Sequence, residues 1–323
     1  MNKKTILLLH TGGTIAMHND PHKGTIILDE QNGLLQQNLS LENFADLIEK
    51  EVFHLPSPHI TLQHMLTLRN AIEGNLQQHA IDGVVITHGT DTLEETAYFL
   101  SLTTNFSIPI VLTGAMRSAN EIGADGSHNL MCAVRVACDE QAHHKGVLVV
   151  MNDEIHHADY VTKTSTSNVA TFQSPQYGPI GIVAKTFIQI AKQPIKRHYL
   201  PVQSISKRVA LLTIYAGMDG DLIDMIESLH YDGLVIEGLG QGNVPPIIAE
   251  KLLQLVIKGI PIVLVSRCYK GIAEGIYGYE GGGKLLQEAG IIFAQGLNGP
   301  KARLKLILFL QQTNPKLSSD RIF

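Results

Sequence analysis

The sequence predicts an α/β protein built on parallel sheets, and the alternation of two patterns along the chain carries that prediction. Short apolar runs rich in β-branched residues alternate with segments whose apolar residues recur at helical spacing. Near-continuous apolar strands belong to sheets that are covered on both faces. The predicted strands of the first half are Ile6–Leu9, Gly83–Thr87, Ile108–Leu112 and Gly146–Met151.

Helices are predicted between these strands, over Leu62–Leu76, Asp91–Leu102 and Asp125–Cys138. Apolar residues of the first and the third helix recur on one helical face. Thr92 and Glu95 match a capping box at the start of the second helix. We therefore interpret the first half of the chain as a series of strand–helix–strand units.

A basic stretch containing Pro194 and Pro201 interrupts this pattern, because proline breaks a helix. Beyond it the alternation resumes, with predicted strands at Val209–Tyr215, Gly233–Glu237 and Ile260–Ser266 and helices at Asp219–Leu229 and from Pro245 onward. The predicted organisation is a flavodoxin-like parallel α/β domain over residues 1–191, a linker over 192–208 and a smaller parallel α/β domain over 209–323.

Composition limits the classes of function. The 323 residues carry a net charge of -5 and are 44% hydrophobic. This charge argues against a nucleic-acid surface, which needs clustered Lys and Arg. The apolar run near the N-terminus is too short for a signal peptide, and none elsewhere is long enough to span a bilayer. We expect a cytoplasmic protein that acts on a small molecule rather than on nucleic acid or a membrane.

The cysteine and histidine patterns indicate neither disulfides nor a metal centre. Cys132, Cys138 and Cys268 form no CxxC pair, so we expect free and mostly buried thiols. The 15 histidines include no HExxH arrangement. The adjacent pairs His143–His144 and His156–His157 are flanked by polar residues, so we interpret them as surface histidines. No metal or cofactor is expected.

Two polar turns carry the candidate chemistry. The turns Thr11–Ala16 and His88–Thr92 each follow a predicted strand and precede a predicted helix. Because such turns share one edge of a parallel sheet, Thr14 and Thr90 can meet there. Neither turn is a GxGxxG or Walker A loop, which disfavours nucleotide phosphate. Helix capping is the alternative explanation for either turn considered alone.

A threonine hydroxyl becomes a nucleophile only when a base takes its proton, and a lysine can do this when burial or other cations lower its pKa. Lys163 is the candidate, because it follows the strand that ends near Met151 and can lie at the same edge. The helix start beside Thr90 and Asp91 favours an anion or a developing oxyanion. A solvated surface lysine is the alternative for Lys163 taken alone.

Sequence motifs spread over both halves of the chain carry a family resemblance. TGGTIA at Thr11–Ala16 and GVVITHGTDTLEETAYFL at Gly83–Leu100 are similar to the two signature motifs of the bacterial-type L-asparaginases. Further agreement comes from TGAMR at 113–117, ADGSHNL at 124–130, VMND at 150–153, VTKT at 161–164, YGPIG at 177–181 and GQGN at 240–243. The resemblance covers essentially the whole chain.

The resemblance implies an amidohydrolase that converts L-asparagine to L-aspartate and ammonia through an acyl-enzyme. It implies that Thr14 is the nucleophile. Thr90, Asp91 and Lys163 would form a second catalytic cluster. In it, neutral Lys163 takes a proton from Thr90, whose hydroxyl acts at the substrate carbonyl, and Asp91 binds the α-ammonium group.

The resemblance also implies substrate-binding roles for further residues. Ser57 would hold the α-carboxylate, and Ala115 would offer its backbone carbonyl to the leaving nitrogen. Pro58 stands where the family commonly has a polar residue and has no N–H to donate. Asn243 and the acidic residue Glu280 would complete the site across a subunit contact, in a homotetramer built from dimers.

The activation of Thr14 is left open by the sequence. The loop Met17–Leu28 contains no Tyr, whereas many relatives carry one there that helps to activate the nucleophile. Thr25, His18 and His22 are the possible substitutes in this loop, and of these only Thr25 falls close to the position of that Tyr in the alignment.

Alternative functions also remain open. A glutaminase-asparaginase of mixed specificity would share every catalytic residue, because one methylene is worth only about 1–3 kcal/mol in discrimination. A non-catalytic small-ligand module is the second alternative. An ammonia-supplying amidotransferase subunit is disfavoured, since its extra N-terminal domain is not expected here.

Overall fold

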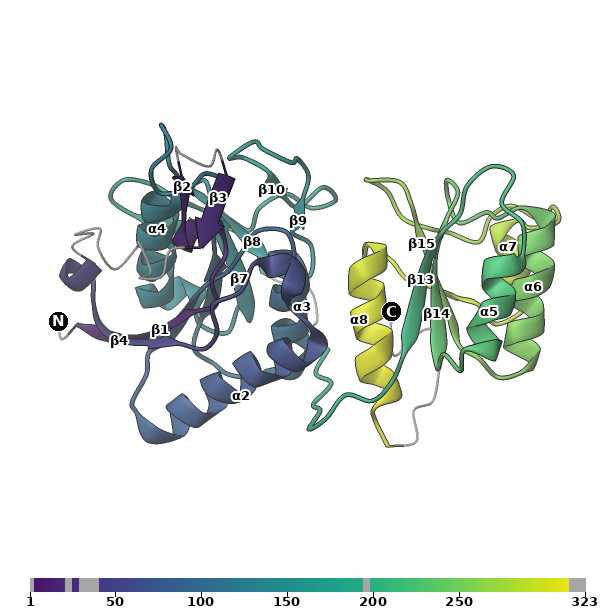
Figure 1. Ribbon diagram of the computed structural model, residues 1–323, viewed down its shortest axis with the longest axis horizontal. Coiled ribbons are helices and arrows are strands. Elements are labelled where there is room, and N and C mark those ends of the chain that lie inside the picture. Colours follow the sequence, from purple (N-terminus) through teal and green to yellow (C-terminus); the bar gives the residue numbers. More distant parts are fainter. Residues whose placement is uncertain (1–2, 21–24, 29–40, 194–197, 314–323) are drawn as a thin grey trace. The chain divides into compact units, whose positions relative to one another are not determined.

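A computed structural model describes residues 3–20, 25–28, 41–193 and 198–313, with the backbone alone for 16–20 and 25–28. The chain divides into two compact units, Met1–Tyr199 and Leu200–Phe323, and each is described by itself (Figure 1). The division falls inside the stretch 192–208 predicted as a linker, and residues 194–197 of that stretch lie outside the described residues. No helix within the described ranges is long and apolar enough to cross a membrane.

The first unit is built on an eight-stranded sheet with the order β12-β11-β8-β7-β6-β5-β1-β4. The strands are β1 (Lys4–His10), β4 (Ala45–Glu51), β5 (Gly83–Thr87), β6 (Ile110–Thr113), β7 (Val147–Met151), β8 (Glu154–His157), β11 (Gly181–Val183) and β12 (Ile188–Ile190). Strands β4, β1, β5, β6 and β7 are parallel and have the 2-1-3-4-5 order of flavodoxin, which confirms the predicted fold class. Strands β8, β11 and β12 extend the sheet with antiparallel pairing.

Helices cover both faces of this sheet. Helices α2 (Leu62–Gln78) and α3 (Leu93–Thr103) lie on one face and α4 (Gly126–Cys138) on the other (Figure 1). Every residue of β5 and β7 is buried, as the continuous apolar runs predict. On the α4 side, Leu130 and Val134 belong to the same buried cluster as strand residues such as Val111.

Short elements complete the first unit. They are the hairpin β2 (Met17–Asp20) and β3 (Thr25–Leu28), the hairpin β9 (Thr162–Lys163) and β10 (Phe172–Gln173), and the 3-10 turns η1 (Thr14–Ala16), η2 (Leu41–Asn43), η3 (Ser57–His59) and η4 (Glu140–Ala142). Neither hairpin, nor β4 at the edge of the sheet, was predicted from the sequence, because short or polar strands lack a continuous apolar run.

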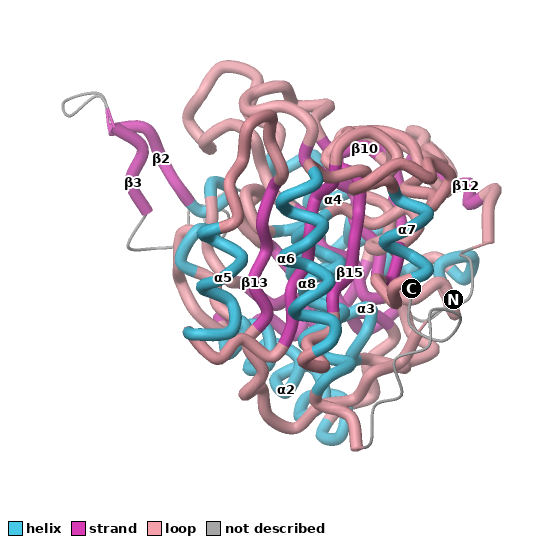
Figure 2. Tube along the Cα trace, turned by 90° about the vertical axis from the view of Figure 1, so that its right-hand side faces the viewer, coloured by secondary structure: helices cyan, strands magenta, loops and turns pink. Residues whose placement is uncertain are grey.

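The second unit is built on a parallel four-stranded sheet, β13 (Val209–Thr213), β14 (Gly233–Gly238), β15 (Ile262–Ser266) and β16 (Ile292–Phe293), in that order. Helices α5 (Asp221–Ser228), α6 (Pro246–Ile257) and α7 (Gly283–Glu288) lie on one face and α8 (Gly299–Leu310) on the other (Figures 1 and 2). Ile223, Ile248 and Leu264 belong to the buried cluster on the first of these faces. The predicted smaller parallel α/β domain is confirmed.

Two expectations about side-chain burial were wrong. His156 and His157 are fully buried, not surface residues, because β8 lies between β7 and β11 rather than in a polar loop. Of the three thiols, Cys132 is buried, Cys138 is half-buried and Cys268 is exposed, so the cysteines are not mostly buried.

Candidate active site

The turns that follow β1 and β5 lie at the carboxyl edge of the first sheet. β1 pairs in parallel with β5, and His10 is opposite Thr87 at the last paired position. From β1 the chain continues to β4, on one side, and from β5 it continues to β6, on the other. Ligands of open α/β sheets bind outside the carboxyl ends of strands where the strand order reverses in this way.

Two glycines allow the turn after β1 to pack against its neighbours. Gly13 has a φ of +86°, and a Cβ atom added there would overlap the Gly89 backbone. Gly12 has a φ of +96°, and its added Cβ would lie 2.5 Å from the Leu55 carbonyl oxygen. A side chain at either position would displace a neighbouring turn. Thr14 follows Gly13, begins η1 and is half-buried.

Hydrogen bonds fix the same turn. The Thr87 carbonyl oxygen accepts both the backbone N–H (3.2 Å) and the hydroxyl (2.8 Å) of Thr11. The Thr11 carbonyl oxygen accepts the Leu55 N–H at 3.1 Å. His10 contacts Thr87 Oγ1 through Nδ1 at 2.9 Å and Glu49 through Nε2 at 2.6 Å. The turn before Thr14 is therefore attached both to β5 and to the segment after β4.

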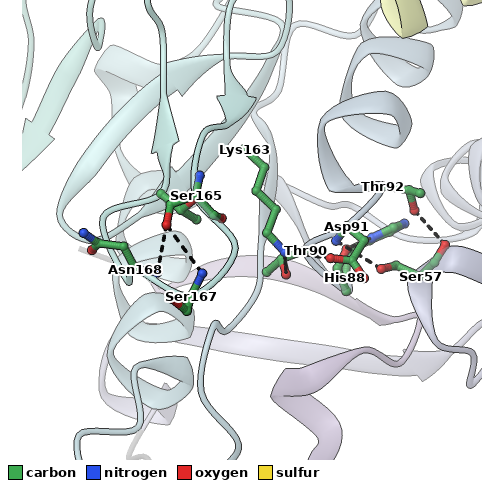
Figure 3. Close-up of polar contacts among 11 residues, drawn as sticks. Ser57, His88, Thr90, Asp91, Thr92, Lys163, Ser165, Ser167 and Asn168 are labelled. Carbon is green, nitrogen blue, oxygen red and sulfur yellow. Dashed lines mark hydrogen bonds and ion pairs between the residues drawn. The ribbon is translucent and has the colours of Figure 1, made fainter.

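Ser57 connects the segment after β4 to the start of α3. Ser57 begins η3 and is buried, and the adjacent Pro58 is exposed. The Ser57 hydroxyl oxygen accepts the Asp91 N–H at 3.1 Å, and its carbonyl oxygen accepts the Thr92 hydroxyl at 2.8 Å (Figure 3). Thr92 makes no side-chain cap on α3, so the predicted capping box with Glu95 was wrong. The Thr92 hydroxyl instead holds Ser57 beside the turn.

Lys163 reaches the turn after β5 from the β9–β10 hairpin. It is opposite Phe172 in that hairpin, and its side chain is 17% exposed. Its Nζ donates to Thr90 Oγ1 at 2.9 Å and to Asp91 Oδ1 at 2.7 Å (Figure 3). Thr90 is buried, whereas the Asp91 side chain is 58% exposed. One amine thus holds a buried hydroxyl and an accessible carboxylate.

Hydroxyl groups fix the loop between β9 and β10. The Thr171 hydroxyl donates to the Ser165 carbonyl oxygen at 2.6 Å, and its oxygen accepts the Ser165 N–H at 2.7 Å. The Ser165 hydroxyl oxygen accepts the N–H groups of Ser167 (3.5 Å) and Asn168 (3.3 Å) (Figure 3). These bonds keep the two strands of the hairpin paired and so set the position from which Lys163 extends.

The turn after β6 contacts the turn that contains Thr90. A Cβ added at Gly114 would lie 2.5 Å from the His88 carbonyl oxygen and 3.3 Å from Thr90 Cγ2. Ala115, the next residue, is buried. The buried Asn129 of α4 donates from Nδ2 to the Gly114 carbonyl oxygen at 3.0 Å. The structure therefore places Ala115 beside the cluster of Thr90, on a turn that α4 holds.

Three residues that position the site were not predicted from the sequence: Asn129, Asp125 and His88. Asp125 carboxylate oxygens accept the N–H groups of Met116 at 3.1 Å and Arg117 at 3.0 Å, which fixes the turn after β6. Asn129 and Asp125 belong to the ADGSHNL motif, to which no role was assigned. The available signal was the polar residue on the apolar face of a helix, because a buried polar group needs a partner.

His88 holds the backbone immediately before Thr90. Its Nδ1 lies 2.8 Å from the Gly89 carbonyl oxygen and its Nε2 2.9 Å from Thr96 Oγ1. A carbonyl only accepts, so Nδ1 carries the proton and Nε2 of the neutral ring accepts the Thr96 hydroxyl. Burial lowers the pKa of His88 to about 4, so the ring is neutral at pH 7 and orients the Gly89 peptide.

Asn243 and Glu280 lie on the second unit. Asn243 follows β14, and its Oδ1 accepts the Gly283 N–H at 3.1 Å. The Val244 N–H donates to the Gly281 carbonyl oxygen at 2.9 Å. The exposed Glu280 therefore adjoins the Asn243 turn, and the structure brings these two predicted residues to one part of the second unit.

The candidates named for the activation of Thr14 belong to the segment that contains the β2–β3 hairpin. The backbone of His18 and Thr25 is described there as strand, with Asp20 opposite Thr25. His22 lies outside the described residues. The residue that removes the Thr14 proton stays a prediction.

Comparison with known protein families decides the assignment of the chain. The family model described as "Asparaginase, N-terminal" matches residues 5–196, and "Glutaminase/Asparaginase C-terminal domain" matches residues 208–323. The chain belongs to the asparaginase family. Membership makes it a hydrolase of amide bonds.

Individual relatives agree with this assignment over nearly the full length. A "Probable L-asparaginase" of Deinococcus radiodurans is 40% identical, with 98% of this chain and 96% of the relative covered. A "Glutaminase-asparaginase" of Pseudomonas aeruginosa is 30% identical, covering 98% and 89%. The crystal structure titled "Probable Cytoplasmic L-asparaginase from Campylobacter jejuni" has a TM-score of 0.86 at 33% identity and covers 96% of each chain.

The contact between the turns predicts that Gly13→Ala destabilises the asparaginase fold. The substitution places a Cβ against Gly89 at a φ of +86°, so we expect a loss of about 2 kcal/mol or more in the free energy of unfolding, together with most of the activity. Urea unfolding measures the loss. Gly74→Ala in α2 is the matched control, because nothing lies within 4 Å of its added Cβ and alanine favours a helix. A Gly13→Ala protein as stable as Gly74→Ala would contradict the close packing.

The buried imidazole predicts a pH dependence of stability. The pKa of His88 is lowered to about 4 from an ordinary value of 6.5, so the unfolded chain binds the proton more readily between these pH values. Protonation of His88 in the unfolded chain should therefore lower the free energy of unfolding by roughly 3 kcal/mol as the pH falls from about 6.5 to 4. In His88→Asn, which keeps a donor for the Gly89 carbonyl, we expect a shallower decline in unfolding free energy between pH 7 and 5.

The control for this measurement is His144→Asn. His144 is exposed with a φ of 60°, which asparagine tolerates. In His144→Asn, the free energy of unfolding should depend on pH as it does in the wild type. If both substitutions change this pH dependence equally, His88 is not its source.

Proposed function

We propose that the chain hydrolyses the side-chain amide of L-asparagine to L-aspartate and ammonia, with Thr14 as the nucleophile. The Thr14 hydroxyl oxygen attacks the amide carbon, the carbon–nitrogen bond breaks, and the nitrogen leaves as ammonia after taking a proton. Water then attacks the threonyl ester, releasing aspartate and restoring the Thr14 hydroxyl. Covalent catalysis of this kind replaces one difficult step by two easier ones.

One observation carries this proposal. Lys163 Nζ is hydrogen-bonded to both Thr90 and Asp91, on the turn against which Gly13 packs. Because Gly13 directly precedes Thr14, the proposed nucleophile and the Lys163 cluster share one edge of the sheet. Helix capping would explain neither the hydrogen bond between the buried Thr90 hydroxyl and the Lys163 amine nor the contact between the two turns.

The polar groups of the cluster match the two ends of an amino-acid substrate. The Asp91 carboxylate is accessible and suits the α-ammonium group. Ser57 Oγ accepts the Asp91 N–H, so its own hydrogen is available to an α-carboxylate. Ala115 supplies a backbone carbonyl for the leaving nitrogen, and Pro58, beside Ser57, contributes shape rather than a donor.

Substrate charge also explains how Lys163 becomes a base. Lys163 donates to Asp91 at 2.7 Å in an ion pair. When the substrate ammonium binds Asp91, a second cation shares that carboxylate, which weakens the attraction that holds the proton on Lys163. Lys163 then releases one proton to water, and the neutral amine takes the proton of Thr90 as the Thr90 oxygen acts at the substrate carbonyl.

The proposal extends to the assembly. Asn243 and Glu280, on the second unit, complete the site of a neighbouring subunit, in a homotetramer built from dimers. This part of the proposal is supported by the hydrogen bonds that hold the turn of Asn243 against the segment of Glu280 on the second unit. A cytoplasmic location is part of the same proposal, and the Campylobacter jejuni relative carries that word in its title.

Ammonia release tests the activity and the substrate together. We expect turnover with L-asparagine to exceed turnover with L-glutamine, and Thr14→Ala, Thr90→Val and Lys163→Met each to lower kcat at least about 100-fold. Thr67→Ala and Lys258→Met, on exposed positions of α2 and at the end of α6, are the controls and should retain full activity. Equal turnover of both substrates would support the mixed glutaminase-asparaginase function, and unaffected turnover in all three variants would refute the site.

The two threonines are distinguished by trapping the intermediate. Acid quenching during turnover, followed by peptide mass mapping, should locate an aspartyl ester on Thr14. The adduct should be absent from Thr14→Ala and still form, slowly, in Lys163→Met. An ester on Thr90 would reverse the assigned roles.

Removal of the substrate ammonium tests Asp91. With L-asparagine, Asp91→Asn should lower kcat/KM about 10- to 100-fold, because a charge-assisted hydrogen bond is lost. With succinamate, which lacks the α-amino group, the wild type should already be slow and the substitution should have little further effect. An equal loss with both substrates would show that Asp91 acts through Lys163 alone.

A further inference from the structure

A histidine, a cysteine and an aspartate meet at a second place on the first unit, outside the proposed active-site cluster. His128 Nε2 lies 2.6 Å from Asp153 Oδ1 and 3.5 Å from Cys132 Sγ, and Cys132 Sγ lies 3.7 Å from the same carboxylate oxygen. All three ligand atoms lie within 4.8 Å of one another. The proposed hydrolysis uses none of these side chains.

The geometry excludes a nucleophilic triad. In such a triad the histidine contacts the cysteine through one ring nitrogen and the acid through the other, whereas here Nε2 faces both groups. Cys132 is 1% exposed. Burial, and next the nearby Asp153 carboxylate, raise the pKa of the Cys132 thiol to about 12. Without a metal the sulfur is a buried thiol rather than an accessible thiolate.

We propose that His128, Cys132 and Asp153 bind one thiophilic divalent cation of the Zn²⁺ class. Bonds of about 2.3 Å to sulfur and 2.0–2.1 Å to nitrogen or oxygen place sulfur about 3.5 Å from the other ligand atoms of a tetrahedron. The observed separations of 3.5 and 3.7 Å match this geometry. Three protein ligands leave the fourth position to water or to an external ligand.

One contact changes when the cation binds. The nitrogen and oxygen atoms of two zinc ligands lie farther apart than the 2.6 Å of the His128–Asp153 hydrogen bond. Both side chains have room to separate, because they are 51% and 57% exposed. The cation replaces the proton that His128 and Asp153 share, and the buried Cys132 thiol loses its proton when its sulfur binds. Both protons go to solvent.

The backbone holds the three ligands in place. His128 and Cys132 are four residues apart on one face of α4, the spacing at which helices present two metal ligands. Asp153 is on the turn between β7 and β8, where Asn152 and Asp153 have φ angles of 50° and 64°. The Asn152 N–H donates to Asn129 Oδ1 at 3.0 Å, which fixes this turn against α4. Two rigid elements thus converge on the site.

Cobalt provides the test, because Co²⁺ occupies zinc sites and reports on its ligands. Full-length protein stripped of metal by a chelator is titrated with Co²⁺. We expect one equivalent to produce the near-ultraviolet charge-transfer band of a thiolate ligand and the intense visible bands of tetrahedral cobalt, both displaced by one equivalent of Zn²⁺. Asp153→Asn and His128→Gln should each weaken Co²⁺ affinity at least about tenfold.

These variants are chosen to fold. Both side chains are about half-exposed, and asparagine accepts the positive φ of position 153. Circular dichroism checks the fold, and Zn²⁺ should raise the thermal midpoint of the wild type but not of Asp153→Asn. Cys268→Ser removes an exposed thiol elsewhere and should retain the full cobalt spectrum. Loss of the thiolate band in Cys268→Ser, or unchanged affinity in both site variants, would overturn the proposal.

Discussion

The candidate active site depends on the close approach of two backbone turns, at Gly13 and Gly89. The approach leaves no space for a Cβ on Gly13, and it occurs where the strand order reverses between β1 and β5. Every other feature is attached to this contact. Ser57, in the segment after β4, is hydrogen-bonded to the start of the segment that leads into α3. Gly114, directly after β6, packs on His88, and Lys163 reaches Thr90 from the β9–β10 hairpin.

The arrangement separates rigid groups from responsive ones. His88, Thr90 and Ser57 are buried, and hydrogen bonds that involve backbone groups hold His88 and Ser57 in place. The Asp91 carboxylate is accessible and forms an ion pair with Lys163. In the proposed reaction, substrate charge therefore acts mainly on the Asp91–Lys163 pair, while the buried groups keep their positions. Preorganised groups of this kind need little rearrangement during a reaction.

Periodicity alone predicted much of the fold and only part of the site. Gly83–Thr87 is a strand with the predicted bounds, because it is apolar and buried on both faces. The apolar periodicity did not predict β4, whose last residues, 49–51, are exposed, or the short hairpin that carries Lys163. Ser57 and Thr92 illustrate a further limit. Their bond joins residues 35 positions apart, and local sequence assigned the Thr92 hydroxyl to its own helix. The cluster of His128, Cys132 and Asp153 was missed for the same reason, since Asp153 arrives from another element.

The separation of β1 and β5 along the chain has a consequence for how the protein acquires activity. The paired residues His10 and Thr87 are 77 positions apart in the sequence, and β4 and α2 both lie between them. Contacts of such long range require large loops to close and form slowly during folding. A refolding chain can contain native helices and still have no site, because the turns meet only after β1 is inserted between β4 and β5. Recovery of activity during refolding would therefore report insertion of the central strand rather than the appearance of secondary structure.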